Sequence, residues 1–155
     1  MKIISTVAAI IFAFTFCTAS CVKGKDSLPT QNNDSSTPST TKMKITIGTA
    51  VFFATLYDNP SANAFRAKFP ITLKMTELNS NEKYFDLPGN LPTNASVGGA
   101  IKAGELNLYG NNTLVLFYKS FYTSYSYTKL GYVDDPTGLA AALGTGEIVV
   151  KFENN

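Results

Sequence analysis

Residues 113–133 read TLVLFYKSFYTSYSYTKLGYV, a stretch in which aromatic and aliphatic side chains alternate with hydroxyl-bearing and charged ones. Successive side chains of a β-strand point to opposite faces, so a period of two is typical of strands. The pattern predicts strands over residues 113–119 and 127–133. Between them, the same alternation places Tyr125 on one face of the chain and Tyr122 on the other.

Similar short patterns lie on both sides of this stretch. Eleven phenylalanines, eight tyrosines and eleven glycines are present, and such a composition favours β structure with tight turns. Further strands are expected over residues 43–48, 51–57, 71–75, 104–110 and 147–152. The expected fold class is therefore mainly β.

Two short helices and one long loop are expected between the strands. The first helix begins at Pro60, with Asn59 as its N-cap, and is stopped by Pro70. The second covers residues 136–144 and ends in a glycine, a common helix stop. Residues 77–99 lack a regular pattern and are rich in glycine and proline, which predicts a long excursion of the kind that often carries function.

The amino-terminal part of the sequence indicates an exported and anchored protein. Residues 1–20 have a positive start, an apolar run that is short for a membrane-spanning helix, and small residues at the end, as in a signal peptide. Cys21 follows in a context that resembles a bacterial lipoprotein processing site, and we expect its thiol to be acylated. The alternative is cleavage near Ser20 that leaves a free thiol. Residues 21–41 are poor in large apolar side chains, which predicts a flexible tether before one folded domain over residues 42–155.

The composition excludes several kinds of site. The chain has no histidine, and Arg66 is its only arginine. Histidine is the commonest general base near neutral pH and the commonest metal ligand, so a Ser-His-Asp triad and an imidazole zinc site are excluded. We expect neither a metal nor a cofactor. The net charge of +2 offers no electrostatic basis for binding nucleic acid.

Four segments together resemble the small bacterial cyclophilin-like proteins. They are YDNPSANAF (57–65), LPTNAS (91–96), LVLFYKSFYTSYSYTKLG (114–131) and DDPTGLAAAL (134–143). The resemblance extends from Met43 to Phe152. It implies a closed, eight-stranded cyclophilin-like barrel with two short capping helices. A closed barrel leaves no free strand edge, which suits an isolated domain.

The resemblance does not extend to the catalytic residues of true cyclophilins, which isomerise the peptide bond before proline. Their catalytic arginine lies in a Phe-His-Arg segment upstream of a Gln-Gly-Gly turn, and neither segment occurs here. Arg66 corresponds to the first helix, where the resemblance implies a structural role. An isomerase must lower a rotational barrier of ~20 kcal/mol, so we expect no prolyl isomerase activity without that arginine.

The aromatic segment contains the candidate binding site. Tyr122, Tyr125 and Tyr127 would line a groove with phenol groups beside apolar rings, which suits a sugar, a peptide backbone or a flat small molecule. Lys129 follows on the same stretch, and Asn94 of the LPTNAS segment would come from the opposite wall. The alternative is that one row of these aromatic side chains packs the barrel while the other faces water.

Other motifs have simpler explanations. Ser126 to Lys129 fits the S-x-x-K motif, but residues three apart on a strand face opposite sides, so we interpret it as a chance match. The pair Asp134-Asp135 is expected to cap the second helix rather than to bind a metal. The segment from Gly144 to Gly146 lacks the third glycine and the following helix of a phosphate-binding loop.

The sequence thus predicts a membrane-tethered cyclophilin-like binding or accessory domain of the bacterial envelope, facing the periplasm or outside the outer membrane. Its expected partners are the membrane, through a lipid on Cys21, and a peptide, a sugar or another envelope protein. The alternative is a weak or unconventional enzyme, either a peptidyl-prolyl isomerase or a hydrolase that uses lysine and tyrosine.

Overall fold

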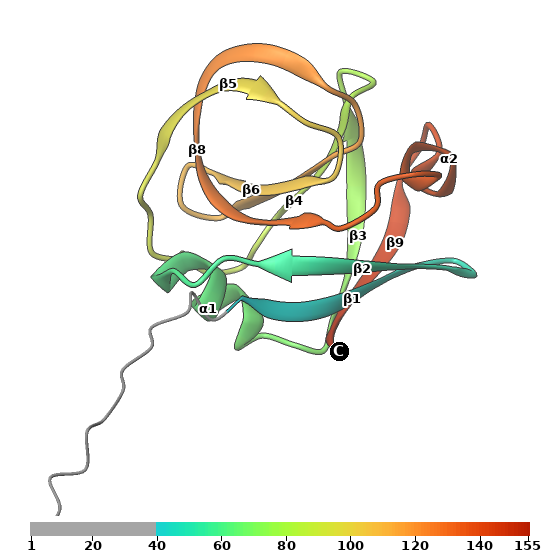
Figure 1. Ribbon diagram of the computed structural model, residues 1–155, viewed down its shortest axis with the longest axis horizontal. Helices are drawn as coiled ribbons and strands as arrows, with labels where there is room; N and C mark the ends of the chain where they lie inside the picture. Colours follow the sequence, from blue (N-terminus) through green and yellow to red (C-terminus); the bar gives the residue numbers. More distant parts are fainter. Residues whose placement is uncertain (1–39) are drawn as a thin grey trace, which may run out of the picture. The chain divides into compact units, whose positions relative to one another are not determined.

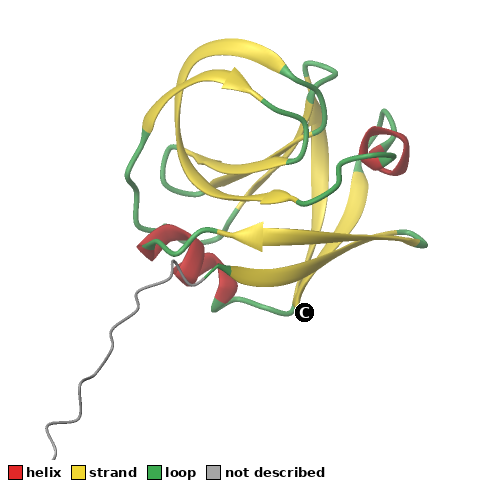
Figure 2. Ribbon diagram, in the orientation of Figure 1, coloured by secondary structure: helices red, strands yellow, loops and turns green. Residues whose placement is uncertain are grey.

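The computed structural model describes residues 40–155, and this part of the chain forms nine strands and two short helices (Figure 1, Figure 2). The predicted leader and Cys21, and all but the end of the predicted tether, lie outside the described residues. The strands are β1 (Thr41–Ile47), β2 (Ala50–Leu56), β3 (Ile71–Leu78), β4 (Glu82–Asp86), β5 (Ser96–Ile101), β6 (Glu105–Tyr109), β7 (Thr113–Phe117), β8 (Phe121–Val133) and β9 (Ile148–Asn154). The helices are α1 (Pro60–Arg66) and α2 (Leu139–Leu143).

The strands close into a barrel. They form one antiparallel sheet in the order β2-β1-β9-β3-β4-β7-β6-β8-β5, and β2 also pairs with β8, so the first eight strands of this order make a ring. β5 pairs with β8 as an added strand, and both are strongly curved in Figure 1. The predicted mainly-β class and the closed eight-stranded barrel with two short helices are confirmed.

Alternate residues of the strands fill the barrel. On β1, Met43 and Ile45 are fully buried, whereas Lys44 between them is half-buried. Phe65 of α1 and Leu143 of α2 belong to the same core cluster as these β1 residues. Burying an apolar side chain of this size contributes roughly 1.5–3 kcal/mol, so both helices are held to the barrel by core packing.

The prediction of a long loop over residues 77–99 was wrong. Strand β3 continues to Leu78, and β4 and most of β5 also fall within this range. The glycines and prolines of this range favoured a loop, but Gly98 lies where a Cβ would come within 2.8 Å of the Thr123 side chain. It therefore marks a close approach of β5 to β8, one of the ordinary uses of glycine in a strand.

The segment from residue 121 to 133 also differs from the expectation. It forms the single strand β8 rather than a stretch followed by a separate strand. The prediction that α1 begins at Pro60 is confirmed, since Asn59 Oδ1 accepts a hydrogen bond of 2.8 Å from Ala62 N. The helix ends at Arg66, ahead of Pro70.

The predicted cap of α2 was wrong, although its end at Gly144 is confirmed. The N-cap is Gly138, with a left-handed φ of 81° and no side-chain cap bond. Asp134 instead accepts hydrogen bonds from Lys42 (2.8 Å) and Thr55 (2.5 Å), which link the chain after β8 to β1 and β2. The Asp134 carboxylate, which local sequence assigned to a helix cap, therefore forms an ion pair with Lys42 instead. Neither helix of residues 40–155 is long and apolar enough to cross a membrane.

Candidate functional site

A second apolar cluster lies outside the barrel core. On β7, Leu114 and Leu116 belong to the main core, whereas Val115 and Phe117 belong to a separate cluster with Tyr127 of β8. Its other members are Ile101 of β5, Tyr84 of β4 and Phe121 of β8. The strand β8 therefore contributes to the ring with its later half, while its first half and β5 cover the other face of the sheet. This arrangement follows from the length of β8, which spans 13 residues.

A pocket of about 540 Å³ opens beside this second cluster. We call it the tyrosine pocket. Alternate residues of β4 face it, namely Glu82, Tyr84 and Asp86, and Thr113 and Val115 of β7 do the same. The remaining lining residues come from the end of β3, the β3–β4 turn, β6 and β8: Leu78, Asn79, Asn81, Tyr109, Phe121, Tyr122, Thr123, Tyr125 and Tyr127. The volume is in the range of a small-molecule site.

The aromatic rings of the tyrosine pocket meet at steep angles. The centroids of Tyr109 and Tyr125 are 6.1 Å apart with the rings at 87°, and Tyr109 and Tyr127 are 5.7 Å apart at 52°. Tyr127 is only 6% exposed and forms the base, whereas Tyr125 and Tyr122 are 63% and 80% exposed at the rim. The rim rings thus leave large areas of their faces free for a ligand.

An irregularity in β8 brings these residues together. The register between β5 and β8 shifts between Val97 and Gly99, so that β8 carries one more residue than its partner there. A bulge of this kind changes the phase of the alternation. Tyr122 and Tyr125, which strict alternation places on opposite faces, therefore both border the pocket.

Glu82 is the buried acidic residue of this site. Its side chain is buried, with 7% of the residue exposed. Burial, reinforced by the negative charge of Glu77, raises the pKa of Glu82 to about 7. Burial and then the nearby Glu82 carboxylate raise the pKa of Tyr127 to about 12, so this phenol stays protonated at neutral pH. Glu82, Tyr84 and Asp86 were missed because their strand was expected to be a loop, and EKYFD shows no alternation of polarity that would have marked it as a strand.

The structure separates Asn94 and Lys129 from the three predicted tyrosines. Both line a second hollow of about 320 Å³ between the start of α1 and the segment before β5. The backbone N–H of Asn94 donates a hydrogen bond of 2.9 Å to Thr128 Oγ1, and Lys129 Nζ lies 3.8 Å from Glu105 Oε2. The five candidate residues therefore belong to two different concavities.

Comparison with known protein families identifies the family of this chain. The sequence model described as the Cyclophilin-like family matches residues 45–153, which is well over half of the chain. The chain belongs to the cyclophilin-like family. A search of curated proteins found no match. The resemblance stated from the four sequence segments is therefore confirmed.

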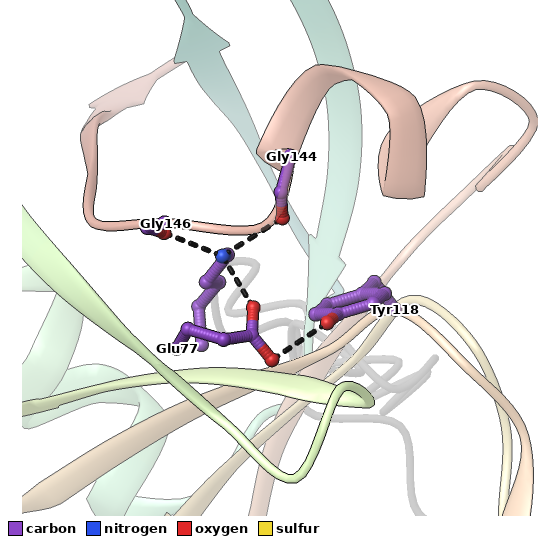
Figure 3. Close-up of polar contacts among 5 residues, drawn as sticks. Glu77, Tyr118, Gly144 and Gly146 are labelled. Carbon is purple, nitrogen blue, oxygen red and sulfur yellow. Dashed lines mark hydrogen bonds and ion pairs between the residues drawn. The ribbon is translucent and has the colours of Figure 1, made fainter.

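This cyclophilin-like protein also contains a polar cluster that the sequence analysis missed (Figure 3). Lys83 of β4 is fully buried. Its ammonium group donates hydrogen bonds to the carbonyl oxygens of Gly144 (2.9 Å) and Gly146 (2.6 Å) and to the Glu77 carboxylate. Tyr118 donates its hydroxyl to the other Glu77 oxygen at 2.7 Å. Lys83 therefore ties the turn between α2 and β9 to the β3–β4 pair.

The electrostatics of this cluster are balanced. Burial would raise the pKa of Glu77, but the hydrogen bonds from Lys83 and Tyr118 outweigh it and leave the pKa below its usual value. All three donor hydrogens of the ammonium group have acceptors. The charged groups of the cluster thus find their hydrogen-bond partners within it, and its role in this cyclophilin-like protein is structural.

Arg66 lies away from the tyrosine pocket. It is exposed on α1 and donates a hydrogen bond of 2.8 Å from Nη1 to Thr41 Oγ1. In residues 40–155, no cluster of three or more acidic or cysteine side chains has the arrangement of a metal site. The chemical groups of the tyrosine pocket in this cyclophilin-like protein are phenols, amides, hydroxyls and carboxyls.

Proposed function

We propose that this cyclophilin-like domain is a membrane-tethered binding domain of the bacterial envelope, and that its ligand occupies the tyrosine pocket. The observation that carries this proposal is the gathering of Tyr122, Tyr125 and Tyr127 around one concavity of about 540 Å³. Phenol groups beside open ring faces can bind apolar surface and donate or accept hydrogen bonds at once. This is a common composition for small-molecule sites.

A binding role without prolyl isomerase activity agrees best with the chemistry of the pocket. The pocket lining contains no arginine that could donate a hydrogen bond to a twisting amide, because Arg66 is engaged on α1. We therefore expect a proline-containing test peptide to isomerise at its uncatalysed rate in the presence of the protein. Catalysed isomerisation would favour the alternative function as an enzyme.

Binding can be tested with a small library of cationic, neutral and anionic compounds, followed by tyrosine fluorescence. The chain has no tryptophan, so the emission reports tyrosines directly. We expect at least one class of compound to bind. Tyr125→Leu should weaken that binding about tenfold, because the stacking or cation–π contact of a ligand with one aromatic ring contributes about this much to affinity. Tyr132→Leu is the matched control, because Tyr132 packs against Tyr57 outside the pocket. Binding that is equally sensitive to both variants would contradict a site at the tyrosine pocket.

The tether requires a separate experiment. We expect wild-type protein in the membrane fraction of its cells and Cys21→Ser in the soluble fraction, because several acyl chains together anchor a protein stably. Cys17→Ser is the matched control, since Cys17 is the only other cysteine, and it should leave the fractionation unchanged. Cys21→Ser that stays in the membrane fraction with unaltered mass would show that this cysteine is not the anchor.

A further inference from the structure

The lining of the tyrosine pocket carries negative charge and many aromatic rings. Two of its residues are acidic, Glu82 and Asp86, and none is lysine or arginine. Five tyrosines and one phenylalanine complete most of its wall. A pocket of this composition repels anions and offers no charge-based advantage to a neutral ligand.

Glu82 stands out among the carboxylates of residues 40–155. Every other side-chain carboxylate in this range accepts a hydrogen bond or forms an ion pair. Glu82, which is buried, does neither. Burying an ionisable group without a partner costs stability, and such groups concentrate at functional sites. The neighbouring Lys83 does not compensate it, because its ammonium group is fully used by Glu77, Gly144 and Gly146.

Asn81 adds a buried acceptor to the lining. The Oδ1 atom of Asn81 is buried and has no hydrogen-bond partner within the described part of the chain. Asn81 directly precedes Glu82, and both line the tyrosine pocket. The Glu82 carboxylate and Asn81 Oδ1 both offer oxygen acceptors, which a ligand with N–H donors or positive charge would satisfy.

The rings are placed to receive a cation. Aromatic faces carry negative electrostatic potential, and cages of several rings are a common way to bind quaternary ammonium groups. Tyr109 and Tyr125 stand nearly perpendicular, and Tyr127 is inclined to Tyr109. The ring planes thus lie in different orientations around the pocket, whereas a flat neutral ligand would be better served by parallel rings.

We propose that the tyrosine pocket binds a small organic cation, such as an amine or a quaternary ammonium group. The positive charge would lie against Glu82, with the attached methyl or methylene groups against Tyr109, Tyr125 and Tyr127. This inference rests on the proposed binding function and gives its ligand class.

The affinity should depend on pH through Glu82. Its pKa of about 7 means that the empty pocket holds this carboxyl partly protonated near neutral pH, and only the ionised form attracts a cation. The charges of Glu77 from β3, Tyr118 after β7 and Tyr127 from β8 interact with Glu82. The other ionisable groups that line the pocket are Tyr84 and Asp86 from β4, Tyr109 from β6, and Tyr122 and Tyr125 from β8. The pKa of Glu77 is below its usual value, and those of Tyr118 and Tyr127 are about 12. We therefore assign an increase in affinity from pH 6 to pH 8 to Glu82.

Choline and its uncharged carbon analogue 3,3-dimethylbutan-1-ol make a matched pair of probes. Both are titrated into the full-length protein in a non-ionic detergent, with tyrosine fluorescence and calorimetry as readouts. We expect saturable choline binding in the millimolar range, and binding of the neutral analogue at least about tenfold weaker. Choline itself does not titrate, so tighter binding at pH 8 than at pH 6 would come from the protein.

Variants of Glu82 separate the effect of its charge on choline binding from the effect of its size. Glu82→Gln keeps the size of the side chain, and it should weaken choline binding about tenfold and abolish the pH dependence. Glu147→Gln is the control, because Glu147 pairs with Lys74 outside the pocket, and it should change neither. If Glu82→Gln fails to fold, the comparison of choline with its neutral analogue on the wild-type protein still shows whether the pocket prefers a cation.

Three results would overturn the inference: equal affinity for the two probes, unchanged choline affinity in folded Glu82→Gln, or no saturable choline binding at concentrations on the order of 100 mM. These outcomes are distinct from failure of the proposed function. Neutral or anionic compounds whose binding depends on Tyr125 would preserve a binding site at the tyrosine pocket and exclude a cation as its ligand. Absence of binding by every class would contradict both.

Discussion

Gly131→Ala is expected to lower the free energy of unfolding by about 3 kcal/mol. Gly131 lies on β8 where this strand pairs with Leu56 of β2 and with Leu106 of β6. A Cβ at this position would come closer than 3.0 Å to the carbonyl oxygen of Thr55 and within 3.1 Å of the Leu56 Cα. Both are backbone atoms, so relief requires the two strands to separate at the seam that closes the barrel.

Chemical denaturation of wild type and Gly131→Ala measures this effect. Gly89→Ala is the matched control, because no atom lies within 4 Å of a Cβ there and its φ is not in the left-handed region. The control should differ from wild type by no more than about 0.5 kcal/mol. If Gly131→Ala is as stable as the control, the close contact between β2 and β8 does not exist as described, and the barrel is open at that seam.

Lys83→Met should lower the free energy of unfolding by about 3 kcal/mol, because removing one partner of a buried ion pair destabilises a protein by about this amount. Methionine preserves most of the volume but leaves the carbonyl oxygens of Gly144 and Gly146 and the Glu77 carboxylate without their shared donor. Lys74→Met provides a comparison. Lys74 also pairs with a glutamate, Glu147, but both side chains are more than half exposed, and loss of such a pair should cost about 0.5 kcal/mol or less.

The same variant has a defined pH signature. The pKa of Glu77 in the folded protein is below its usual value, so its contribution to stability is fully present above the pKa of the unfolded chain, about 4.5, and is lost as the pH falls through the folded pKa. Without Lys83 this contribution shrinks. The unfolding free energies of wild type and Lys83→Met should therefore converge as the pH is lowered, as followed by urea denaturation. A difference that is independent of pH would contradict a role for the Glu77 pair.

Part of the candidate site could be predicted from sequence. Tyr122, Tyr125 and Tyr127 share one aromatic stretch, and their composition alone suggests a binding surface. Glu82 could not be found in this way, since EKYFD does not alternate in polarity and prolines and glycines follow it. The bulge that brings Tyr122 and Tyr125 to one pocket has no local signature, because it depends on the register between β5 and β8.

Local sequence by itself determined the strands with clear alternation, the start of α1 at Asn59 and Pro60, and the absence of histidine chemistry. Each depends on neighbouring residues or on composition, which are visible without a fold. Tertiary structure alone decided that Lys83 is buried, that Glu82 lacks a partner, that Asp134 pairs with Lys42 instead of capping α2, and that Asn94 and Lys129 lie apart from the tyrosines. The physical reason is that burial and pairing of a charged side chain depend on strands distant in sequence, which meet only when the barrel closes.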